Sequence, residues 1–450
     1  MSFFKAYDMR GTFGVDFDLD MVRRVGEALP KVVGGGRWLV GRDARASSPA
    51  VRDALVAGLA AGGAEVVDIG LATTPMVYFF TAEDGFDGSV MITASHNPPT
   101  DNGLKVSRAG SVPVGYDSGL AEVERMVASD SQSAISDSGF QIPESRPSIP
   151  DPQFSIRYCD WLKKHVESDC SGLRFAVDCS DGMASLVAHD LFPGALFLND
   201  VPDGSFPHHS PNPLLPEARE QLAECVRANG LDCGVIFDGD ADRCMFVDET
   251  GAFIQPDYLI PVLAGTFAEK GCVIHDVRTS RAAIEAIRAM GAKPIMGKVG
   301  HAFAKMLLRE TGAVCGGELA GHYYFRDFHF CDSGEWAAMR MLGAFAEAKR
   351  RGESVSRFLT PITRKYANSG EMNFKVSDKP AAIERVLKAA ASFGREIGRE
   401  TMDGVRVEFE EGWVSVRQSN TEPYLRLLAE CDTGERLEEW KKAMVAAVDQ

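Results

Sequence analysis

The sequence Cys233-Gly234-Val235-Ile236-Phe237-Asp238-Gly239-Asp240-Ala241-Asp242-Arg243 places a short apolar run directly before a loop with three aspartates. The apolar run, residues 232–238, predicts a buried β-strand. Carboxylates at every second position of a tight loop can turn towards one hard cation, and the glycine permits the bend. Three carboxylates with few other ligands suit Mg²⁺, which keeps positions open for water or phosphate oxygens. This stretch therefore predicts a sheet with a metal-binding loop at the end of one strand.

An EF-hand is the sharpest alternative for the aspartate loop. With Asp238 as the first position, Asp240, Asp242 and Glu249 fall where that calcium loop has ligands. The sixth position, however, is Arg243, where the calcium loop requires glycine. The preceding residues also predict a strand rather than a helix. The sequence therefore favours a magnesium loop over an EF-hand.

The pattern of a strand followed by a loop with polar side chains occurs twice more. Residues 90–93 lead into 94–98, and residues 313–315 lead into 316–322. Ligands of α/β sheets bind beyond the carboxyl ends of the strands, so three such loops could form one site. Elsewhere strands alternate with helices, which is typical of mixed α/β domains. The predicted helices are 48–61 and 280–290, and the further strands are 37–40, 64–69, 88–93, 173–178, 271–276 and 293–296.

Composition shifts divide the chain into four predicted domains. Residues 129–152 are rich in Ser, Asp and Pro and read as a linker or a long loop. Weaker boundaries fall near 250–257 and 363–371. Beyond the last of these, helices 379–391 and 435–448 and strands 405–410 and 413–416 suggest a small α+β unit. We expect three mixed α/β domains and a smaller C-terminal α+β domain, with these bounds: 1–150, 151–252, 253–364 and 365–450.

The composition excludes several classes of function. A net charge of −16 over 450 residues argues against binding to nucleic acid or to anionic membranes. No apolar run reaches the ~18–20 residues that span a bilayer, and the N-terminal residues lack the pattern of a secretory signal. We therefore expect a cytoplasmic protein. The ten cysteines occur singly, without a Cys-x-x-Cys pair, so we expect reduced thiols rather than a zinc or redox site.

Ser95 is a candidate nucleophile in Thr93-Ala94-Ser95-His96-Asn97-Pro98. A serine directly after a buried strand can be held rigidly, as nucleophilic catalysis requires. An ordinary turn is the alternative, because Ser, Asn and Pro are common turn residues. The segment is not a Gly-x-Ser-x-Gly elbow, which argues against an acyl-transferring hydrolase.

Two further segments are candidates for anion and ligand binding. Arg417-Gln418-Ser419-Asn420-Thr421-Glu422-Pro423, with Arg426 nearby, could hold a phosphate through guanidinium, hydroxyl and backbone donors, or could be a plain β-turn. Gly316-Gly317-Glu318-Leu319-Ala320-Gly321-His322 could pass close to a ligand, with Lys298 and His301 upstream. The alternative there is a structural histidine and a solvated glutamate. Arg243, beside the aspartates, offers planar donors for a phosphate.

Together these segments resemble the α-D-phosphohexomutase family, especially its bacterial phosphomannomutase/phosphoglucomutase branch. The resemblance covers nearly the whole chain in the same order. It is carried by five motifs, which are Lys5-Ala6-Tyr7-Asp8-Met9-Arg10-Gly11 and the segments 93–98, 238–243, 318–322 and 417–423. It implies four domains around a central cleft, with the last domain closing on a hinge near 363–371.

The resemblance also implies roles for individual residues. Ser95 would carry the phosphoryl group, and Mg²⁺ would be bound by Asp238, Asp240, Asp242 and the phosphoserine oxygen. Lys105, Arg10 and His301 would serve as acid/base or charge-stabilising catalytic residues. The implied substrate-binding residues are Arg243, Arg278, Lys298, Glu318, His322, Arg417, Ser419, Asn420, Thr421 and Arg426.

Two positions depart from the family pattern. Ala320 stands where the family usually has serine, which removes one hydrogen bond to the sugar. Arg278 stands where the family often has lysine, which keeps the charge but changes the geometry. Both departures therefore concern the choice of hexose rather than the type of reaction.

The resemblance implies an enzyme that interconverts mannose 6-phosphate and mannose 1-phosphate through a hexose 1,6-bisphosphate, with glucose or glucosamine phosphates as alternative substrates. Its partners would be small sugar phosphates, and its state a monomer or a dimer. A metal phosphatase is disfavoured, because such sites use two metals and the sequence shows one acidic cluster. A non-catalytic sugar-phosphate binding protein would not need the serine, the aspartates and the arginine together.

Overall fold

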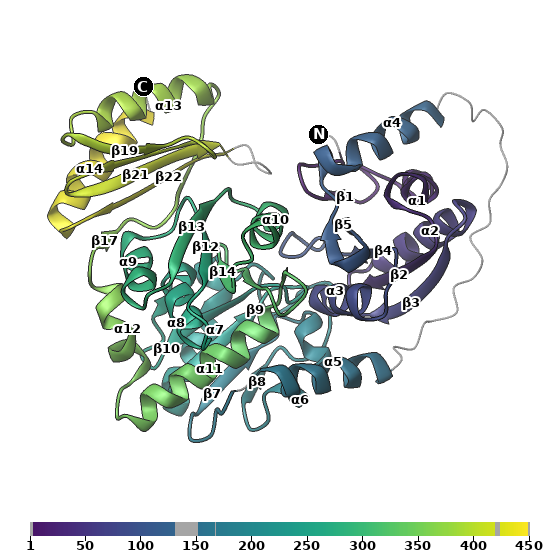
Figure 1. Cartoon of the computed structure of the whole chain (residues 1–450), viewed down its shortest axis with the longest axis horizontal. Coiled ribbons are helices and arrows are strands. Elements are labelled where there is room, and N and C mark those ends of the chain that lie inside the picture. The colour runs from purple at the N-terminus through teal and green to yellow at the C-terminus, as the bar shows by residue number, and fades with distance from the viewer. Residues whose placement is uncertain (1–2, 131–151, 167, 419–423, 449–450) are drawn as a thin grey trace.

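The computed structural model describes residues 3–130, 152–166, 168–418 and 424–448. These residues form four sheets, each from a separate segment of the chain. In Figure 1 the N-terminal unit and the C-terminal unit lie on opposite sides of the two middle units. Most of the predicted linker, residues 131–151, lies outside the described residues.

The first sheet has the order β1-β5-β4-β2-β3, with β6 paired to β5. Its central strands are parallel, while β5 runs antiparallel to β1 and β4. The strands are β1 (Met9–Thr12), β2 (Arg37–Arg42), β3 (Glu65–Leu71), β4 (Gly88–Ile92), β5 (Asp101–Arg108) and β6 (Val112–Pro113). The helices are α1 (Leu19–Val33), α2 (Ser48–Ala61), α3 (Thr74–Glu83) and α4 (Leu120–Asp130).

Alternating side chains of β2 explain why this sheet is covered on both faces. Trp38 and Val40 pack in a cluster with α1 and α2, whereas Leu39 packs in another with α3. Successive residues of a strand point to opposite faces, so an apolar run needs a layer of helices on each side. Packing on both faces therefore holds β2 and β4, and with them the ends of these strands, in place.

The second sheet has the order β11-β10-β9-β7-β8, and the third has the order β13-β12-β14-β15-β16. The second consists of β7 (Phe175–Asp178), β8 (Leu196–Leu198), β9 (Cys233–Phe237), β10 (Cys244–Asp248) and β11 (Phe253–Ile254), with α5 (Pro152–His165), α6 (Ala188–Leu191) and α7 (Pro216–Asn229). The third consists of β12 (Cys272–Asp276), β13 (Lys293–Gly297), β14 (Cys315–Gly317), β15 (Tyr323–Phe325) and β16 (Cys331–Asp332), with α8 (Leu259–Gly265), α9 (Arg281–Ala289), α10 (His301–Thr311), α11 (Gly334–Arg350) and α12 (Val355–Thr363).

The C-terminal sheet is antiparallel, with the order β17-β22-β21-β20-β19 and β18 paired to β22. Its elements are β17 (Ala367–Asn368), β18 (Met372–Lys375), α13 (Lys379–Ala390), β19 (Glu396–Glu400), β20 (Val405–Phe409), β21 (Gly412–Gln418), β22 (Tyr424–Cys431) and α14 (Gly434–Val448). Short 3-10 helices occur at Ala109–Ser111, Tyr116–Ser118, Met183–Leu186 and Pro256–Tyr258. Three mixed α/β units and one α+β unit are confirmed; the domain boundaries remain predictions.

The first three units share one core in addition to apolar clusters of their own, whereas the fourth has a separate core. One buried apolar cluster contains side chains from all three α/β units, such as Leu39, Phe237 and Phe325. The C-terminal cluster is built around Trp440 and packs α13 and α14 on the sheet. The junction combines polar contacts, such as the ion pair of Arg281 with Glu408 at 2.9 Å, with a small apolar cluster of Leu319, Trp413 and Leu428. Interfaces that include many polar contacts are typical of domains that move relative to one another.

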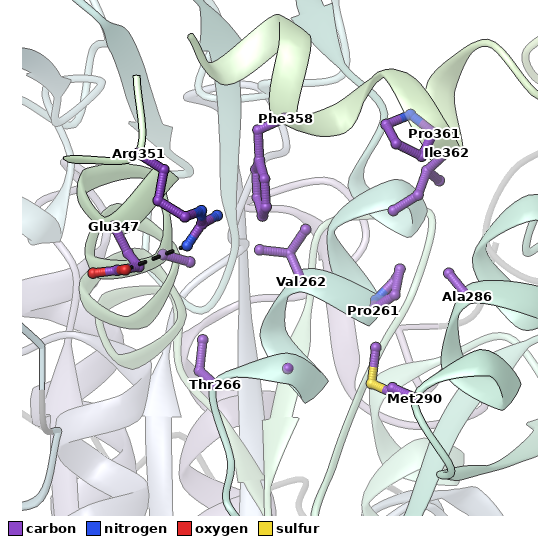
Figure 2. A pocket seen from close by; sticks show the side chains of 12 residues that line it. Pro261, Val262, Thr266, Ala286, Met290, Glu347, Arg351, Phe358, Pro361 and Ile362 are labelled. Carbon is purple, nitrogen blue, oxygen red and sulfur yellow. Dashed lines mark hydrogen bonds and ion pairs between the residues drawn. The ribbon is translucent and has the colours of Figure 1, made fainter. Parts of the chain in front are cut away.

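A cavity of about 420 Å³ lies between helices α8, α9, α11 and α12 (Figure 2). Its charged lining residues, Glu347 and Arg351, pair with each other at 3.4 Å. None of the residues singled out in the sequence lines this cavity, so the candidate site lies elsewhere.

All ten cysteines are free, as expected. Within the described ranges no helix combines the length and hydropathy needed to cross a membrane.

Candidate active site

The Ser95 loop (residues 93–98) follows β4 and is packed tightly in the interior. Ser95 is 3% exposed, and its backbone lies in the left-handed region with φ 51°. Its amide donates to Oγ1 of Thr93 at 2.8 Å, and its Oγ donates to Oδ2 of Asp238 at 2.8 Å. The candidate nucleophile therefore contacts the acidic loop directly.

The acidic loop (residues 238–243) is the turn of the β9–β10 hairpin. Asp238, Asp240 and Asp242 are fully buried, and one carboxylate oxygen from each lies within 4.8 Å of the others. Strands on both sides of the loop confirm that it is not an EF-hand, which needs two helices. Burial raises the pKa of Asp238 to about 7. Asp240 and Asp242 raise this pKa as well, whereas Arg243 lowers it. Such crowding of buried carboxylates is relieved by a cation.

Lys105, from β5 of the first sheet, reaches into this loop. Its ammonium donates to Oδ2 of Asp240 at 2.6 Å and also to Oδ2 of Asp242. Burial opposes ionisation of Asp242, yet Lys105, His322 and Arg243 hold its pKa well below the ordinary value. The Oδ1 atoms of Asp240 and Asp242 are buried without a hydrogen-bond partner among the described residues. Hard carboxylate oxygens that accept no hydrogen bond are suitable ligands for a divalent cation such as Mg²⁺.

Arg243 and Arg10 place two further cations beside the Ser95 loop. Nε of Arg243 donates to Oδ2 of Asp238 at 2.8 Å, the same oxygen that Ser95 contacts. Arg10, on β1, donates to Asp8 at 2.7 Å and to Oδ1 of Asn97 at 3.3 Å. Guanidinium groups on either side of a serine can neutralise the charge of a transferring phosphoryl group.

The Glu318 loop (residues 316–322) joins the acidic loop through the backbone. Arg243 and His322 form an isolated antiparallel bridge, which brings Nε2 of His322 to 3.6 Å from Oδ1 of Asp242. Oε1 of Glu318 accepts from the Tyr324 hydroxyl at 3.0 Å and from the Gly300 amide at 3.1 Å. A carboxylate fixed by two donors is a suitable partner for sugar hydroxyls.

His301, at the start of α10, lies between the rings of Tyr7 and His322, with centroid distances of 5.1 and 6.0 Å. Burial, together with Lys305 and Lys105, lowers its pKa well below the ordinary value. Neither ring nitrogen has a hydrogen-bond partner among the described residues. The lowered pKa favours the neutral imidazole, and its ring nitrogens are not engaged by other described side chains.

A second group of site residues lies at the junction with the C-terminal unit. Glu371 pairs with Arg278 at 3.1 Å and with Arg426 at 2.8 Å, while Arg417 pairs with Asp403 at 3.2 Å. Asp276 also pairs with Arg278, at 2.6 Å, so three arginines face three carboxylates, and what the group offers a phosphate is a set of guanidinium donors rather than an excess of positive charge. Ser419, Asn420 and Thr421 lie outside the described residues.

The segment 297–301 connects the two groups. The Val299 amide donates to Oδ2 of Asp403 at 2.9 Å, and the next amide, of Gly300, donates to Glu318. Lys298, in the same segment, is exposed, and among the described residues its ammonium lies over the Phe303 ring at 5.6 Å rather than in either group. The structure thus brings the predicted residues together in two linked groups, with Lys298 at their edge.

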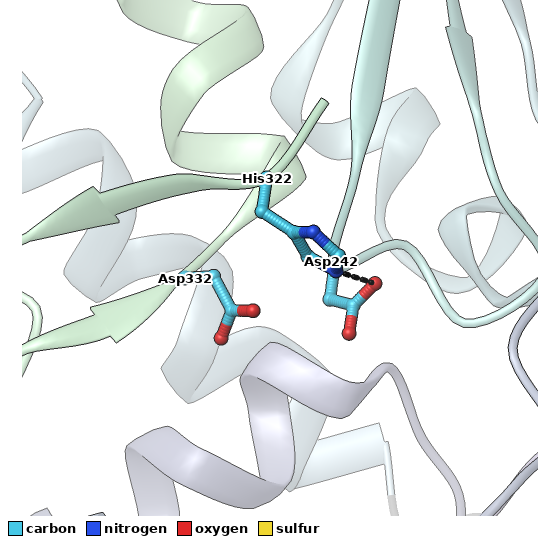
Figure 3. Close-up of side chains that lie close together, drawn as sticks. All are labelled: Asp242, His322 and Asp332. Carbon is cyan, nitrogen blue, oxygen red and sulfur yellow. Dashed lines mark ion pairs between the residues drawn. The ribbon is translucent and has the colours of Figure 1, made fainter. Parts of the chain in front are cut away.

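The single acidic cluster expected from the sequence extends through Asp242 into the third unit. Asp242, His322 and Asp332 form a second group whose ligand atoms lie within 4.8 Å of one another (Figure 3). Asp332 comes from β16, and its carboxylate lies 2.7 Å from the ammonium of Lys305. The sequence alone did not link Asp332 to His322, because a strand and a loop separate them.

Two positioning contacts were also missed. Thr74, at the start of α3, donates its amide to the Asp240 carbonyl at 2.9 Å and its hydroxyl to Oδ2 of Asp240 at 2.6 Å. Arg45 donates to the carbonyl of Ser95 at 2.8 Å. Arg45 lies in the loop after β2, and Thr74 begins the helix that follows β3. A position shortly after a strand is the sequence signal that could have identified both residues.

Comparisons with known families match the chain in four consecutive parts. The matching models are phosphoglucomutase/phosphomannomutase alpha/beta/alpha domain I over residues 1–134, domain II over 157–251, domain III over 255–366, and the C-terminal domain over 371–447. Each matched part contains one of the four sheets, except that β11 and β17 lie between matched parts.

Individual proteins give the same result. The chain is 38% identical over 437 residues to phosphohexose mutases of Xanthomonas campestris, covering 95% of this chain and 94% of that protein. It is 35% identical over 443 residues to a phosphomannomutase of Escherichia coli, with the same coverage. Among solved structures, a phosphoglucomutase/phosphomannomutase family protein of Burkholderia thailandensis superposes with a TM-score of 0.84 at 30% identity, covering 99% of this chain and 96% of that one.

Proposed function

Because the chain belongs to the phosphoglucomutase/phosphomannomutase family, we propose that it interconverts mannose 6-phosphate and mannose 1-phosphate through a phosphorylated Ser95. The observation that carries this proposal is the contact of Ser95 Oγ with Asp238, inside a buried group of carboxylates and cations. Mannose is the proposed hexose because curated relatives over most of the chain are phosphomannomutases.

The reaction runs in two transfers of the same kind. First, the bond between Oγ of Ser95 and phosphorus breaks, while a bond forms to the free sugar hydroxyl, whose proton passes to a base. This gives a hexose 1,6-bisphosphate. After the bisphosphate turns over, Oγ of Ser95 takes the phosphoryl group from the other end. Lys105, Arg10 and His301 are the proposed acid/base and charge-stabilising residues, because their side chains surround the two loops.

The acidic loop is the proposed magnesium site, with Asp238, Asp240 and Asp242 as protein ligands and an oxygen of the phosphorylated Ser95 as the fourth. Mg²⁺ bound there would neutralise charge on the phosphoryl oxygens. Arg243 opposes the rise in the pKa of Asp238 that burial causes, and its 2.8 Å contact orients the carboxylate. Lys105 pairs with the Oδ2 atoms of the other two aspartates, which leaves their Oδ1 atoms available to the cation.

The arginine group at the C-terminal junction is the proposed site for the non-reacting phosphate. Arg417 and Arg426, from β21 and β22, face Arg278 of the third unit. Ser419, Asn420 and Thr421 would complete this site. A bisphosphate that turns over needs one fixed position that accepts either phosphate, and closure of the last domain near residues 363–371 would exclude water meanwhile.

Sugar recognition is assigned to Glu318 and His322, with Arg243 beside them. Ala320 cannot donate a hydrogen bond, so discrimination at one hydroxyl is relaxed and glucose phosphates are a proposed second substrate. A mutase for glucosamine phosphate is the alternative within the same family. Cytoplasmic location and a monomeric or dimeric state remain predictions.

A coupled mutase assay tests the proposal. Purified enzyme is assayed with mannose 1-phosphate, glucose 1-phosphate and glucosamine 6-phosphate, with Mg²⁺ and glucose 1,6-bisphosphate as activator. We expect the highest kcat/KM for mannose 1-phosphate and a lower one for glucose 1-phosphate. A preference for glucosamine 6-phosphate would reassign the substrate. Binding of all three without turnover would instead support a non-catalytic binding protein, and steady release of inorganic phosphate would support a phosphatase.

A further inference from the structure

Arg45, on the loop between β2 and α2, is completely buried against the Ser95 loop. Nη2 of its guanidinium donates to the backbone carbonyls of Ser95 at 2.8 Å and Asn97 at 2.7 Å. Nη1 donates to the carbonyl of Asp101 at 3.0 Å and to that of Pro98. One side chain therefore holds four carbonyls of the segment that carries the candidate nucleophile.

The remaining donor of Arg45 is used as well. Nε donates to Oδ2 of Asp43 at 3.0 Å, so all five N–H groups of the guanidinium are paired. A lysine has three donors at a single point and cannot reproduce this planar arrangement. The contact pattern thus depends on the shape of the arginine side chain and not only on its charge.

The backbone that Arg45 holds is strained. Ser95 has φ 51°, which non-glycine residues adopt rarely and which persists only when the surroundings fix it. Gly204 and Phe206 of the second unit pack against the other side of Arg45. A Cβ on Gly204 would lie 2.3 Å from Cα of Arg45, and the Phe206 ring lies 5.1 Å from the guanidinium. Arg45 is therefore a rigid support between the two units that form the site.

We propose that Arg45 is a positioning residue for phosphoryl transfer. By fixing the carbonyl of Ser95, it fixes the direction in which Oγ points, and that direction is towards Asp238. This inference rests on the proposed function, since it requires that Ser95 carries the phosphoryl group. Loss of the five-donor arrangement slows transfer at Ser95 but leaves the sugar-phosphate contacts of the arginine group in place.

The test measures one half-reaction apart from turnover. Dephosphorylated enzyme is mixed with glucose 1,6-bisphosphate in a quenched-flow device, and phosphorylated Ser95 is followed by mass spectrometry. In this step the sugar O–P bond breaks, the Ser95 Oγ–P bond forms, and the serine proton passes to the sugar oxygen. The variants are Arg45→Lys and Arg45→Ala. Arg52→Ala is the matched control, because Arg52 is also largely buried but pairs with Asp53 and Asp68 instead.

We expect Arg45→Lys to slow phosphorylation of Ser95 by about 100-fold, the size of loss that follows a displacement near 1 Å. KM for mannose 1-phosphate should stay within about threefold of wild type, and Arg52→Ala should match wild type in both. Millimolar guanidinium should restore part of the rate to Arg45→Ala, which a purely structural role would not allow.

A wild-type rate in Arg45→Lys would overturn the inference, as would a loss confined to KM. If Arg45→Ala does not fold, Arg45→Lys decides alone, because it keeps a positive charge for Asp43. Failure of wild-type enzyme to become phosphorylated on Ser95 would overturn the proposed function, and this inference with it. The two failures are therefore distinguishable.

Discussion

Oγ of Ser95 and Oδ2 of Asp238 lie 2.8 Å apart, although 143 positions separate them in the chain. One belongs to the loop after β4 of the first sheet and the other to the β9–β10 hairpin of the second. Neither loop alone distinguishes a catalytic serine from a turn. Their contact does, because a serine hydroxyl beside three buried carboxylates and Lys105 is suited to phosphoryl transfer assisted by a metal.

The close packing of these two loops makes Gly239 a sensitive position. A Cβ there would lie 2.6 Å from the carbonyl oxygen of Ser95, so Gly239→Ala must push the loops apart. We expect kcat to fall by about 100-fold with a stable fold. Gly265→Ala is the control, because a Cβ at Gly265 meets nothing within 4 Å. Equal kcat values in the two variants would show that the spacing of the loops is not critical.

Metal dependence follows from the acidic loop. Treatment with EDTA should abolish turnover, and Mg²⁺ should restore it, because Asp240 and Asp242 keep buried oxygens that accept no hydrogen bond from the described residues. Asp242→Asn should lower kcat by at least about 1,000-fold, since a bound metal ion contributes several kcal/mol to the transition state. Activity that is indifferent to chelation would remove the metal assignment.

Arg417→Ala tests whether one site serves either phosphate. Hydrogen bonds to a charged group contribute about 1.5–3 kcal/mol, so KM should rise about 10- to 100-fold for mannose 1-phosphate and glucose 1-phosphate alike. Arg395→Ala is the control in the same domain, because Arg395 is 78% exposed and pairs with an exposed Glu410. An increase in KM for only one of the two sugars would contradict a shared phosphate site.

Asp257 should make the folding free energy depend on pH. Burial raises its pKa to about 7, against the hydrogen bond from the Ser280 amide, while the unfolded carboxyl titrates near ~4. The carboxyl of Asp257 therefore stays protonated to a higher pH in the folded protein than in the unfolded chain. The stability that this proton contributes is complete below about pH 4 and is lost as pH rises through about 7.

Asp257→Asn should remove that dependence. At about 1.4 kcal/mol per pH unit, the advantage of the variant over wild type should grow by about 2–3 kcal/mol between pH 5 and pH 8. Urea unfolding at both pH values measures this difference. An advantage that does not change with pH would show that Asp257 is already ionised in the folded protein.

Local patterns predicted most of the fold. The helix expected at 48–61 has the bounds of α2, and the strand expected at 37–40 lies within β2. Apolar runs of a few residues and helical periodicity are properties of one segment, so they can be read without the rest of the chain. Strand ends were less accurate, because hydrogen bonds with neighbouring strands determine where pairing stops.

The site was predictable only in part. The order of its motifs indicated Ser95 and the aspartates, and the structure places those residues in contact. The contacts of Arg45 with four carbonyls and the approach of Asp332 to His322 depend on how loops fold over one another. No spacing in the sequence specifies such contacts, and Arg45 lies outside the five motifs that carry the resemblance.

The most direct test of the central claim is the fate of the phosphoryl group on Ser95 in a single turnover. Enzyme phosphorylated on Ser95 is mixed with less than one equivalent of mannose 1-phosphate, and both the protein mass and the sugar products are followed. The account predicts that Ser95 loses its phosphoryl group as hexose 1,6-bisphosphate appears and regains it as mannose 6-phosphate forms, and that Ser95→Ala forms neither sugar product. Formation of mannose 6-phosphate by Ser95→Ala, or turnover during which the phosphoryl group never leaves Ser95, would contradict it.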